Sequence, residues 1–195
     1  LEVTTVHSVA GMLRTDAGIV TDRPFRAPHH TISSAALLGG GDPLRPGEMT
    51  LSHHGVLFLD ELLEFRRHVL EGMRQPLETG EVTICRARNR ATFPARPLLV
   101  AAVNPCPCGY FQVSGRCRCS PSQIDRYLGR MSGPLLDRID LHVGLPQVSI
   151  RDLESGPRGE PSLAIRARVI AARAVQEQRW AAGETSARRN GTLTL

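Results

Sequence analysis

Two adjacent carboxylates follow an unbroken apolar run in residues 55–61, which read Gly-Val-Leu-Phe-Leu-Asp-Glu. Such a run is typical of a strand buried on both faces of a parallel sheet. In open α/β sheets, ligands bind at the carboxyl ends of the strands. The acidic pair therefore fits a Walker B element, in which Asp60 would hold Mg²⁺ on a nucleotide and Glu61 would polarise the attacking water. The alternative is a strand that ends in a solvated acidic turn.

A second apolar run, Pro97 to Asn104, also ends in a polar residue. It predicts another buried strand, with Asn104 at its tip. A neutral amide at such a tip could hold the lytic water or touch a γ-phosphate without adding charge. The alternative role for Asn104 is to form a turn before Pro105.

A proline- and glycine-rich loop at 105–120 carries four cysteines with the spacing C-x-C-x₈-C-x-C. They are Cys106, Cys108, Cys117 and Cys119. In a cytosolic chain, two cysteine pairs brought together by a turn suggest tetrahedral zinc rather than disulfides. Structural zinc would order a loop that has little apolar content. Free thiols and disulfides remain the alternatives, because C-x-C is tighter than the common C-x₂-C spacing.

Size and composition indicate one soluble globular domain or part of one, with 195 residues, 41% hydrophobic and 22% charged. We find no apolar run long enough to span a bilayer and no signal-peptide pattern, so we expect a cytoplasmic protein and no membrane partner. The net charge of +5 permits a polyanionic partner, although a solvated basic surface also accounts for it.

The sequence contains no lysine, so all 24 basic residues are arginine. A phosphate-binding loop of the form GxxxxGK[ST] therefore cannot occur in this chain. If Asp60 and Glu61 serve an ATP site, the site is incomplete here.

The remaining pattern predicts helices and strands around these motifs. Helices are expected within residues 1–20, at 33–38, at 62–75 with Pro76 closing the helix, at 122–131, and at 162–180 with Ser162 as its cap. A hairpin is expected from 81–84 and 91–93 around an arginine-rich tip at 86–90, and a third strand at 141–145.

Three further features carry no predicted chemistry. Cys85 lies apart from the other cysteines and is interpreted as a packing residue. The pairs His29-His30 and His53-His54 suggest metal ligands at first sight, but we assign a metal to neither pair and interpret the second as structural.

Four segments together resemble the magnesium-chelatase-like AAA+ ATPases, and most closely their bacterial ComM/YifB branch. They are VLFLDE, LVAAVNP, GPLLDRIDLHV, and RPFRAPHHTIS followed by GGG. The resemblance covers roughly residues 1–180. The ETGEV stretch at 78–82 also fits, because this clade has a hairpin before its sensor strand.

The resemblance implies ATP and Mg²⁺ as cofactors and assigns roles to the motif residues. Asp60 would coordinate Mg²⁺, Glu61 would activate water, and Asn104 would be sensor 1. Arg138 in LLDRID would be the arginine finger, since a guanidinium spreads positive charge over the developing anion. The alternative for Arg138 is a salt bridge to Asp137 or Asp140.

An arginine finger acts on the nucleotide of a neighbouring subunit, so the resemblance also implies a homo-oligomeric ring, as in the family's hexamers. For the ComM branch it implies ATP-driven movement on branched DNA during recombination or transformation. Three arginines of the hairpin tip, Arg86, Arg88 and Arg90, could then face DNA phosphates. A solvated charged turn is the alternative.

The chain departs from the family pattern at both ends. The family's glycine-rich loop would precede Leu1, and the lid would continue beyond residue 195. Leu63 replaces the proline expected in the DELPEF pattern. We expect an α/β fold with a partial AAA+ core at 1–154 containing the 105–120 insert, a linker at 155–161, and a helix with the start of a truncated lid at 162–195. The parent would be an ATPase, and this chain alone would be inactive.

Two rival functions remain open. One is a non-catalytic, zinc-containing nucleic-acid-binding module built on the cysteine loop and the arginine hairpin. The other is an ATPase subunit of a true magnesium chelatase, which would drive metal insertion into a porphyrin.

Overall fold

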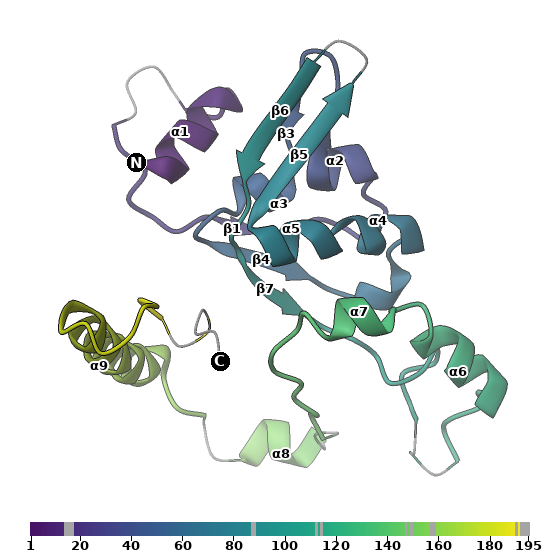
Figure 1. The fold of residues 1–195 in the computed structure, drawn as a ribbon. Helices are drawn as coiled ribbons and strands as arrows, with labels where there is room; N and C mark the ends of the chain where they lie inside the picture. The colour runs from purple at the N-terminus through teal and green to yellow at the C-terminus, as the bar shows by residue number, and fades with distance from the viewer. Residues whose placement is uncertain are drawn as a thin grey trace. The chain divides into compact units, whose positions relative to one another are not determined.

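The computed structural model describes residues 1–13, 18–86, 89–111, 113, 115–146, 148, 150–156, 159–189 and 191. These residues form two compact units, one at Leu1–His142 and the other at Val143–Leu195. The first unit contains the strands and most of the helices, and the second contains two helices (Figure 1).

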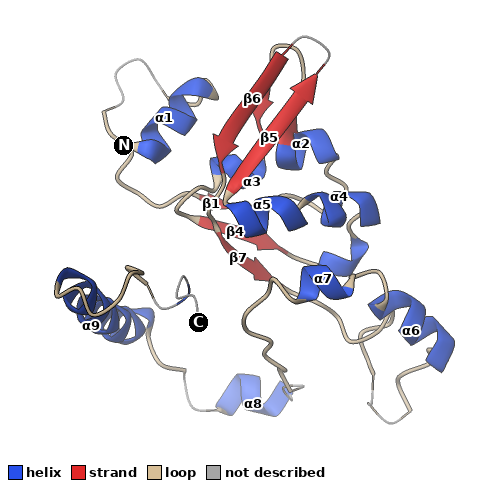
Figure 2. Ribbon diagram, viewed as in Figure 1, coloured by secondary structure: helices blue, strands red, loops and turns tan. Residues whose placement is uncertain are grey.

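A three-stranded parallel sheet lies at the centre of the first unit, in the order β1-β4-β7 (Figure 2). Its strands are β1 (Phe25–Arg26), β4 (Val56–Leu59) and β7 (Leu98–Ala101). Gly55, just before β4, lets its backbone approach that of Pro24, just before β1, since a Cβ at Gly55 would lie 2.0 Å from the carbonyl oxygen of Pro24. That carbonyl accepts a hydrogen bond from the next residue, Val56, at 2.8 Å. The acidic segment thus starts from a tightly packed strand.

Two antiparallel pairs accompany the sheet. The hairpin of β5 (Glu81–Arg86) and β6 (Asn89–Pro94) projects away from it (Figure 1). A short ribbon joins β2 (Gly39–Gly40) to β3 (Arg45–Pro46). The predicted hairpin is therefore present, with its strands slightly longer than expected.

Seven α-helices and one 3₁₀ helix are described in the first unit. They are α1 (Glu2–Val9), α2 (Ser34–Leu38), α3 (Glu48–Leu51), η1 (Leu62–Glu64), α4 (Arg67–Gly72), α5 (Arg74–Thr79), α6 (Pro121–Leu128) and α7 (Gly133–Leu136). Ser33 caps α2 by accepting from the backbone N–H of Ala36. In the second unit, α8 is Ile150–Ser155 and α9 is Ser162–Ala181.

The core lies where β4 meets the helices that follow it. Leu57 and Leu59 of β4 are fully buried with Phe65, Val69 and Met73. Each such side chain contributes about 1.5–3 kcal/mol relative to an exposed position. The inward stripe predicted for residues 62–75 is therefore confirmed as core.

The prediction of one continuous helix at 62–75 is wrong, because the segment forms three short helices. Phe65 has an extended backbone (φ −62°, ψ 147°), which separates η1 from α4, and Met73 separates α4 from α5. Pro76 does not close a helix but lies in the first turn of α5. Proline is tolerated there because the first-turn N–H groups have no partner within the helix.

The prediction that the acidic strand is buried on both faces is also wrong. Burial alternates along β4, with Val56 and Phe58 only partly buried. On the neighbouring strands Phe25, Leu98 and Val100 are exposed. One face of the sheet packs on the core, and the other face carries exposed or partly buried apolar side chains. The unbroken apolar run therefore shows that both faces are apolar, but only one of them is buried.

The strand predicted at 141–145 is absent, and its segment has no regular structure. Leu141, Val143 and Leu145 are all highly exposed. Residues 141–145 alternate in polarity but pair with no strand among the described residues. The third strand of the sheet is β1 instead.

The second unit differs from the prediction at its helix start and its apolar face. Pro161, not Ser162, is the N-cap of α9, and no side chain caps it. No residue of α9 is buried, although Ile165, Val169 and Val175 lie on its predicted inward stripe.

Candidate functional site

The carboxyl edge of the parallel sheet gathers the polar residues that the sequence singled out. Strands β4 and β7 pair in parallel, with Leu59 opposite Ala101. Asp60 and Glu61 follow directly on the first strand, and Asn104 comes three residues after the second. The pairing continues beyond the strands, because Ala102 donates its N–H to the Leu59 carbonyl at 3.0 Å. Carboxylates and amide therefore leave the sheet at the same edge.

The backbone turns sharply at Glu61, which has left-handed dihedral angles (φ 50°, ψ 47°). Two hydrogen bonds hold this turn. The Glu61 N–H donates to Oδ1 of Asp60 at 2.9 Å, and the Leu62 N–H donates to the Ala102 carbonyl at 3.0 Å. A left-handed glutamate is strained by about 1–2 kcal/mol, so the surrounding bonds must maintain it.

Both edge carboxylates are exposed, as is Asn104. Glu61 is half-exposed in its side chain and lies beside a histidine: its Oε2 is 3.3 Å from Nδ1 of His30. His30 belongs to the segment that follows β1, so all three neighbouring strands contribute a residue to this edge. The sequence reasoning missed His30. The only signal for it was its position after the extended segment that became β1.

Helix α6 is tied to the same turn. Nη1 of Arg130 donates to the Leu63 carbonyl at 2.6 Å and to Oε2 of Glu64 at 3.2 Å. Tyr127 is buried nearby; burial raises its pKa, and the negative charge of Glu64 adds to the effect. The cysteine loop leads directly into this helix, whose start is fixed by a capping box between Ser120 and Gln123.

Arg138 contacts neither aspartate considered as its partner in the sequence. Its Nη2 donates to Oε2 of Glu78 on α5 at 2.8 Å. The guanidinium hydrogen bond lowers the pKa of Glu78, and the carboxylate raises that of Arg138. The arginine is partly exposed and lies in the first unit, after α7.

The four loop cysteines converge on one point. Their sulfur atoms all lie within 4.8 Å of one another. Sγ of Cys106 is 3.4 Å from that of Cys108 and 3.9 Å from that of Cys117, and the last two are 3.8 Å apart. Four sulfurs around a tetrahedral zinc at the usual Zn–S distance lie about 3.8 Å from each other. The donor set therefore fits zinc in number, type and spacing.

Three of these thiols, Cys108, Cys117 and Cys119, have shifted pKa values. The backbone N–H of Tyr110 lowers the pKa of Cys108 to about 6, whereas the hydrogen bond to Cys108 raises that of Cys119 to about 12. The thiolate of Cys108 is thus stabilised, while the raised pKa values of Cys117 and Cys119 favour their protonated forms. A metal bound among them would release those protons.

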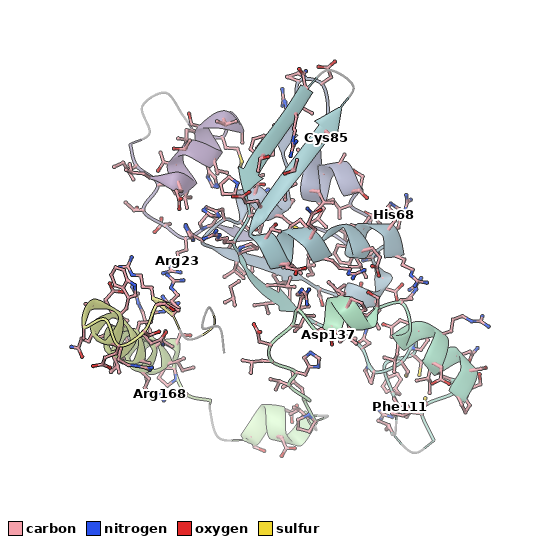
Figure 3. The ribbon with its side chains drawn as sticks, viewed as in Figure 1. Arg23, His68, Cys85, Phe111, Asp137 and Arg168 are labelled. Carbon is pink, nitrogen blue, oxygen red and sulfur yellow. The ribbon has the colours of Figure 1, made fainter. Side chains whose placement is uncertain are left out.

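Cys85 is not a packing residue, because it is exposed on β5. It lies on the hairpin, well away from the cysteine loop, which Phe111 marks (Figure 3). Of the three hairpin arginines, Arg90 is described and exposed. Arg88 and the side chain of Arg86 lie outside the described part of the structure.

The second histidine pair forms a separate cluster with Glu2. Oε2 of Glu2 is 2.7 Å from Nε2 of His54 and 3.4 Å from Nε2 of the buried His53. Nδ1 of His53 accepts the backbone N–H of Arg96 at 3.1 Å. Since Nδ1 is an acceptor, the ring proton of neutral His53 lies on Nε2, which cannot then ligate a metal. This geometry supports the structural interpretation of the pair.

The mixed α/β fold, with its three-stranded parallel sheet and helices, is that of a partial P-loop nucleoside triphosphatase core. Residues 1–153 match the family described as "Magnesium chelatase, subunit ChlI". The chain belongs to this magnesium-chelatase-like AAA+ family.

Several bacterial proteins are similar over most of the chain. It is 47% identical to competence protein ComM of Haemophilus influenzae over 182 residues, which are 92% of this chain and 36% of that protein. It is 49% identical to YifB of Escherichia coli and 47% identical to YifB of Salmonella typhimurium, each over 159 residues, which are 80% of this chain and 31% of the relative. The chain thus spans about a third of the length of these relatives.

Among the described residues, no helix combines the length and apolar composition that crossing a bilayer requires.

Proposed function

We propose that this chain is the part of an AAA+ ATPase that carries the hydrolytic residues of the nucleotide site. One observation supports this most directly: the parallel pairing of β4 and β7 delivers Asp60, Glu61 and Asn104 to the same edge of the sheet. Membership in the magnesium-chelatase-like family supports nucleotide and Mg²⁺ use.

The proposed roles follow from the chemistry of each group. Asp60 would hold Mg²⁺ through water, using the oxygen that does not accept the Glu61 N–H. Glu61 would take a proton from the water that attacks the γ-phosphorus, while the bond between that phosphorus and the β,γ-bridging oxygen breaks. Asn104 would contact the γ-phosphate or orient the water.

A phosphate-binding loop with a lysine is also required, and this sequence has no lysine. The loop would therefore be supplied by a longer protein that contains this segment, and the greater length of the relatives is compatible with that. By itself the chain is expected to bind Mg-ATP weakly or not at all.

Arg138 is proposed as the arginine finger of a homo-oligomeric ring. Six subunits, as in the family's hexamers, would form this ring if the heterologous contact closes after six copies. Its hydrogen bond to Glu78 is exposed, and exposed ion pairs are weak, so the guanidinium can exchange this partner for a phosphate of the neighbouring subunit.

Remodelling of branched DNA in recombination or transformation is the proposed work of the intact protein. The name of the Haemophilus relative, a competence protein, supports it. The exposed Arg90 on the projecting hairpin supplies a positive charge for DNA phosphates.

Two measurements test the ATPase proposal. In the longer protein, Glu61→Gln should lower the rate of ATP hydrolysis about a hundredfold or more, because the amide cannot accept the proton. Calorimetry on the chain alone should show little or no Mg-ATP binding. Hydrolysis that survives Glu61→Gln would contradict the proposal.

We also propose structural zinc in the cysteine loop, held by Cys106, Cys108, Cys117 and Cys119. The purified chain should contain about one zinc per molecule by elemental mass spectrometry, as a four-thiolate site predicts. Cys108→Ser should remove most of it. The matched control is Cys85→Ser, which alters an exposed cysteine on the hairpin and should leave the zinc content unchanged. Equal metal content in both variants would contradict the assignment.

The second candidate function is nucleic-acid binding by the cysteine loop without catalysis. Tyr110 and Phe111 are exposed in this loop, and the Arg116 guanidinium lies 5.8 Å from the centre of the Tyr110 ring. Aromatic rings beside arginines can stack on unpaired bases. Fluorescence anisotropy with a labelled single-stranded oligonucleotide tests this: binding by the chain alone, lost in Tyr110→Ala, would favour this function over the first.

A further inference from the structure

Arg130, which follows helix α6, reaches back to the turn that carries the proposed base. Its Nη1 donates to the Leu63 carbonyl at 2.6 Å and to Oε2 of Glu64 at 3.2 Å. Arg130 and Leu63 are 67 residues apart in the sequence, so the contact depends on the packing of α6 against η1. One guanidinium thus holds two successive residues of the turn from outside it.

The bond to the Leu63 carbonyl is the stronger of the two contacts. Leu63 is 0% exposed, so its carbonyl must find a donor within the protein. Hydrogen bonds from a charged donor are stronger than those from a neutral one. The ion pair with Glu64 contributes less, because both of its side chains are nearly half exposed. Arg130 therefore acts on the turn mainly through a buried backbone group.

The turn needs an external support because Glu61 has a left-handed backbone, which is unfavourable for glutamate. Two backbone bonds close the turn. The Leu62 N–H donates to the Ala102 carbonyl at 3.0 Å, and the Glu64 N–H donates to the Glu61 carbonyl at 2.7 Å. Without Arg130, the strained residue could relax and carry its carboxylate away from the edge of the sheet. A general base must stay close to its water, so such a movement would slow proton transfer.

The position of Arg130 is set by α6 and by the cysteine loop before it. Cys119, the last cysteine of the loop, directly precedes Ser120, which forms the capping box of α6 with Gln123. At the other end of the helix, Tyr127 is buried, and its carbonyl accepts the N–H of Arg130 at 3.2 Å. The helix is therefore fixed at its start by the loop and at its end by a buried ring.

We infer that Arg130 is a positioning residue for the proposed base: presented by α6 and the cysteine loop, it holds the Leu63 carbonyl and so keeps Glu61 in its left-handed conformation. This inference rests on the proposed ATPase function. Arg130 touches neither the nucleotide nor the water in this scheme and acts only through the turn.

The first test uses the chain itself and needs no ATP. Amide hydrogen exchange, followed by ¹H–¹⁵N spectra, reports how often the two bonds of the turn open. Arg130→Met keeps a long unbranched side chain but has no N–H donor, so the Leu62 and Glu64 N–H groups should exchange about tenfold faster than in the unaltered chain. Arg130→Lys should restore most of the protection, because an ammonium can also donate to a carbonyl.

Arg126→Met is the matched control, because Arg126 is exposed on the same helix and the variant loses the same charge. It should leave both exchange rates unchanged. Equal exchange in Arg130→Met and the unaltered chain would overturn the inference. An equal increase throughout the β5–β6 hairpin would also overturn it, because it would show a loss of overall stability rather than release of the turn.

The same measurement tests the contribution of the cysteine loop. Cys108→Ser should raise exchange at the same two N–H groups, because α6 would lose its fixed start. Cys85→Ser, on the hairpin, is the control and should change neither rate. Unchanged exchange in Cys108→Ser would show that α6 holds Arg130 without the loop and would overturn that part of the inference.

The second test measures hydrolysis in the longer protein that carries the segment. Arg130→Met should lower kcat about tenfold and change KM by less than about twofold, since positioning acts on the chemical step. Arg130→Lys should recover most of the rate. If Arg130→Met keeps the full rate while Glu61→Gln abolishes hydrolysis, the positioning role is wrong and the ATPase proposal stands. If Glu61→Gln retains hydrolysis, the proposed function itself fails, and the exchange rates alone decide whether Arg130 holds the turn.

Discussion

The two histidine pairs of this chain are alike in sequence and differ in surroundings. Ring centroids lie 4.0 Å apart in His29-His30 and 3.9 Å apart in His53-His54. Each pair also contacts one glutamate. The first pair, however, lies at the carboxyl edge of the sheet, and the second joins α1 to the segments around α3 and β7.

The difference lies in burial and in the partner of the second ring nitrogen. His53 is 2% exposed and accepts a backbone N–H from Arg96, so both of its nitrogens have protein partners. His30 keeps 28% of its side chain exposed and directs Nδ1 to Glu61. The same dipeptide is therefore part of the packing in one place and contacts an exposed carboxylate at the edge of the sheet in the other.

The largest expected effect tests whether His53 is structural. His53→Ala should lower the free energy of unfolding by about 2–3 kcal/mol, because it removes a buried ring, opens a cavity and leaves the Arg96 N–H without its acceptor. His30→Ala should lower it by less than about 1 kcal/mol, as expected at a partly exposed site. Urea unfolding followed by circular dichroism measures both. Equal losses would remove the distinction between the pairs.

A smaller effect should come from pH. Burial lowers the pKa of His53 below the ordinary 6.5, and the neighbouring charge of His54 adds to the effect, while Glu2 opposes it. The unfolded chain then binds a proton more readily than the folded one, so this stability is present above about pH 6.5 and is lost as the pH falls.

Urea midpoints measured between about pH 7.5 and 5 should therefore fall in the unaltered chain. His53→Asn keeps an acceptor for the Arg96 N–H but cannot titrate, so its decline should be shallower. Hydrogen bonds from His54 and His53 lower the pKa of Glu2, and that contribution to stability is lost only as the pH falls below the ordinary carboxylate value of 4.5. An equally steep decline in the variant would show that another group is responsible.

The smallest effect should come from the glutamate of the second pair. Glu2→Gln should change the free energy of unfolding by less than about 0.5 kcal/mol, because exposed ion pairs contribute little. Two-thirds of the Glu2 side chain is exposed. A loss comparable to that of His53→Ala in the same urea experiment would show that the cluster depends on its charge rather than on burial.

Much of the first unit could be predicted from residue type and spacing. Leu62, Phe65, Val69 and Met73 are buried although the predicted helix is broken at Phe65. Apolar side chains determine which residues are buried, whereas local backbone angles determine whether a helix continues. The hairpin could be predicted because paired short runs around a charged turn specify their own partner.

Contacts between distant segments could not be predicted in the same way. The exposed Leu141, Val143 and Leu145 show that an alternating pattern does not form a strand without a neighbour to pair with. His30 meets Glu61 only through the order of strands in the sheet, which no local pattern encodes. Of the candidate site, the types of the edge residues could be predicted, whereas their packing partners could not.

The left-handed backbone conformation of Glu61 lowers the stability of the fold. Asparagine adopts these dihedral angles more readily than glutamate does, so a chain selected only for robustness would not keep glutamate at this turn. Replacing Glu61 with Asn would relieve about 1 kcal/mol of strain. It would also replace the carboxylate with an amide on a shorter side chain. A laboratory search for heat-resistant variants would thus tend to discard the group that we propose as the base.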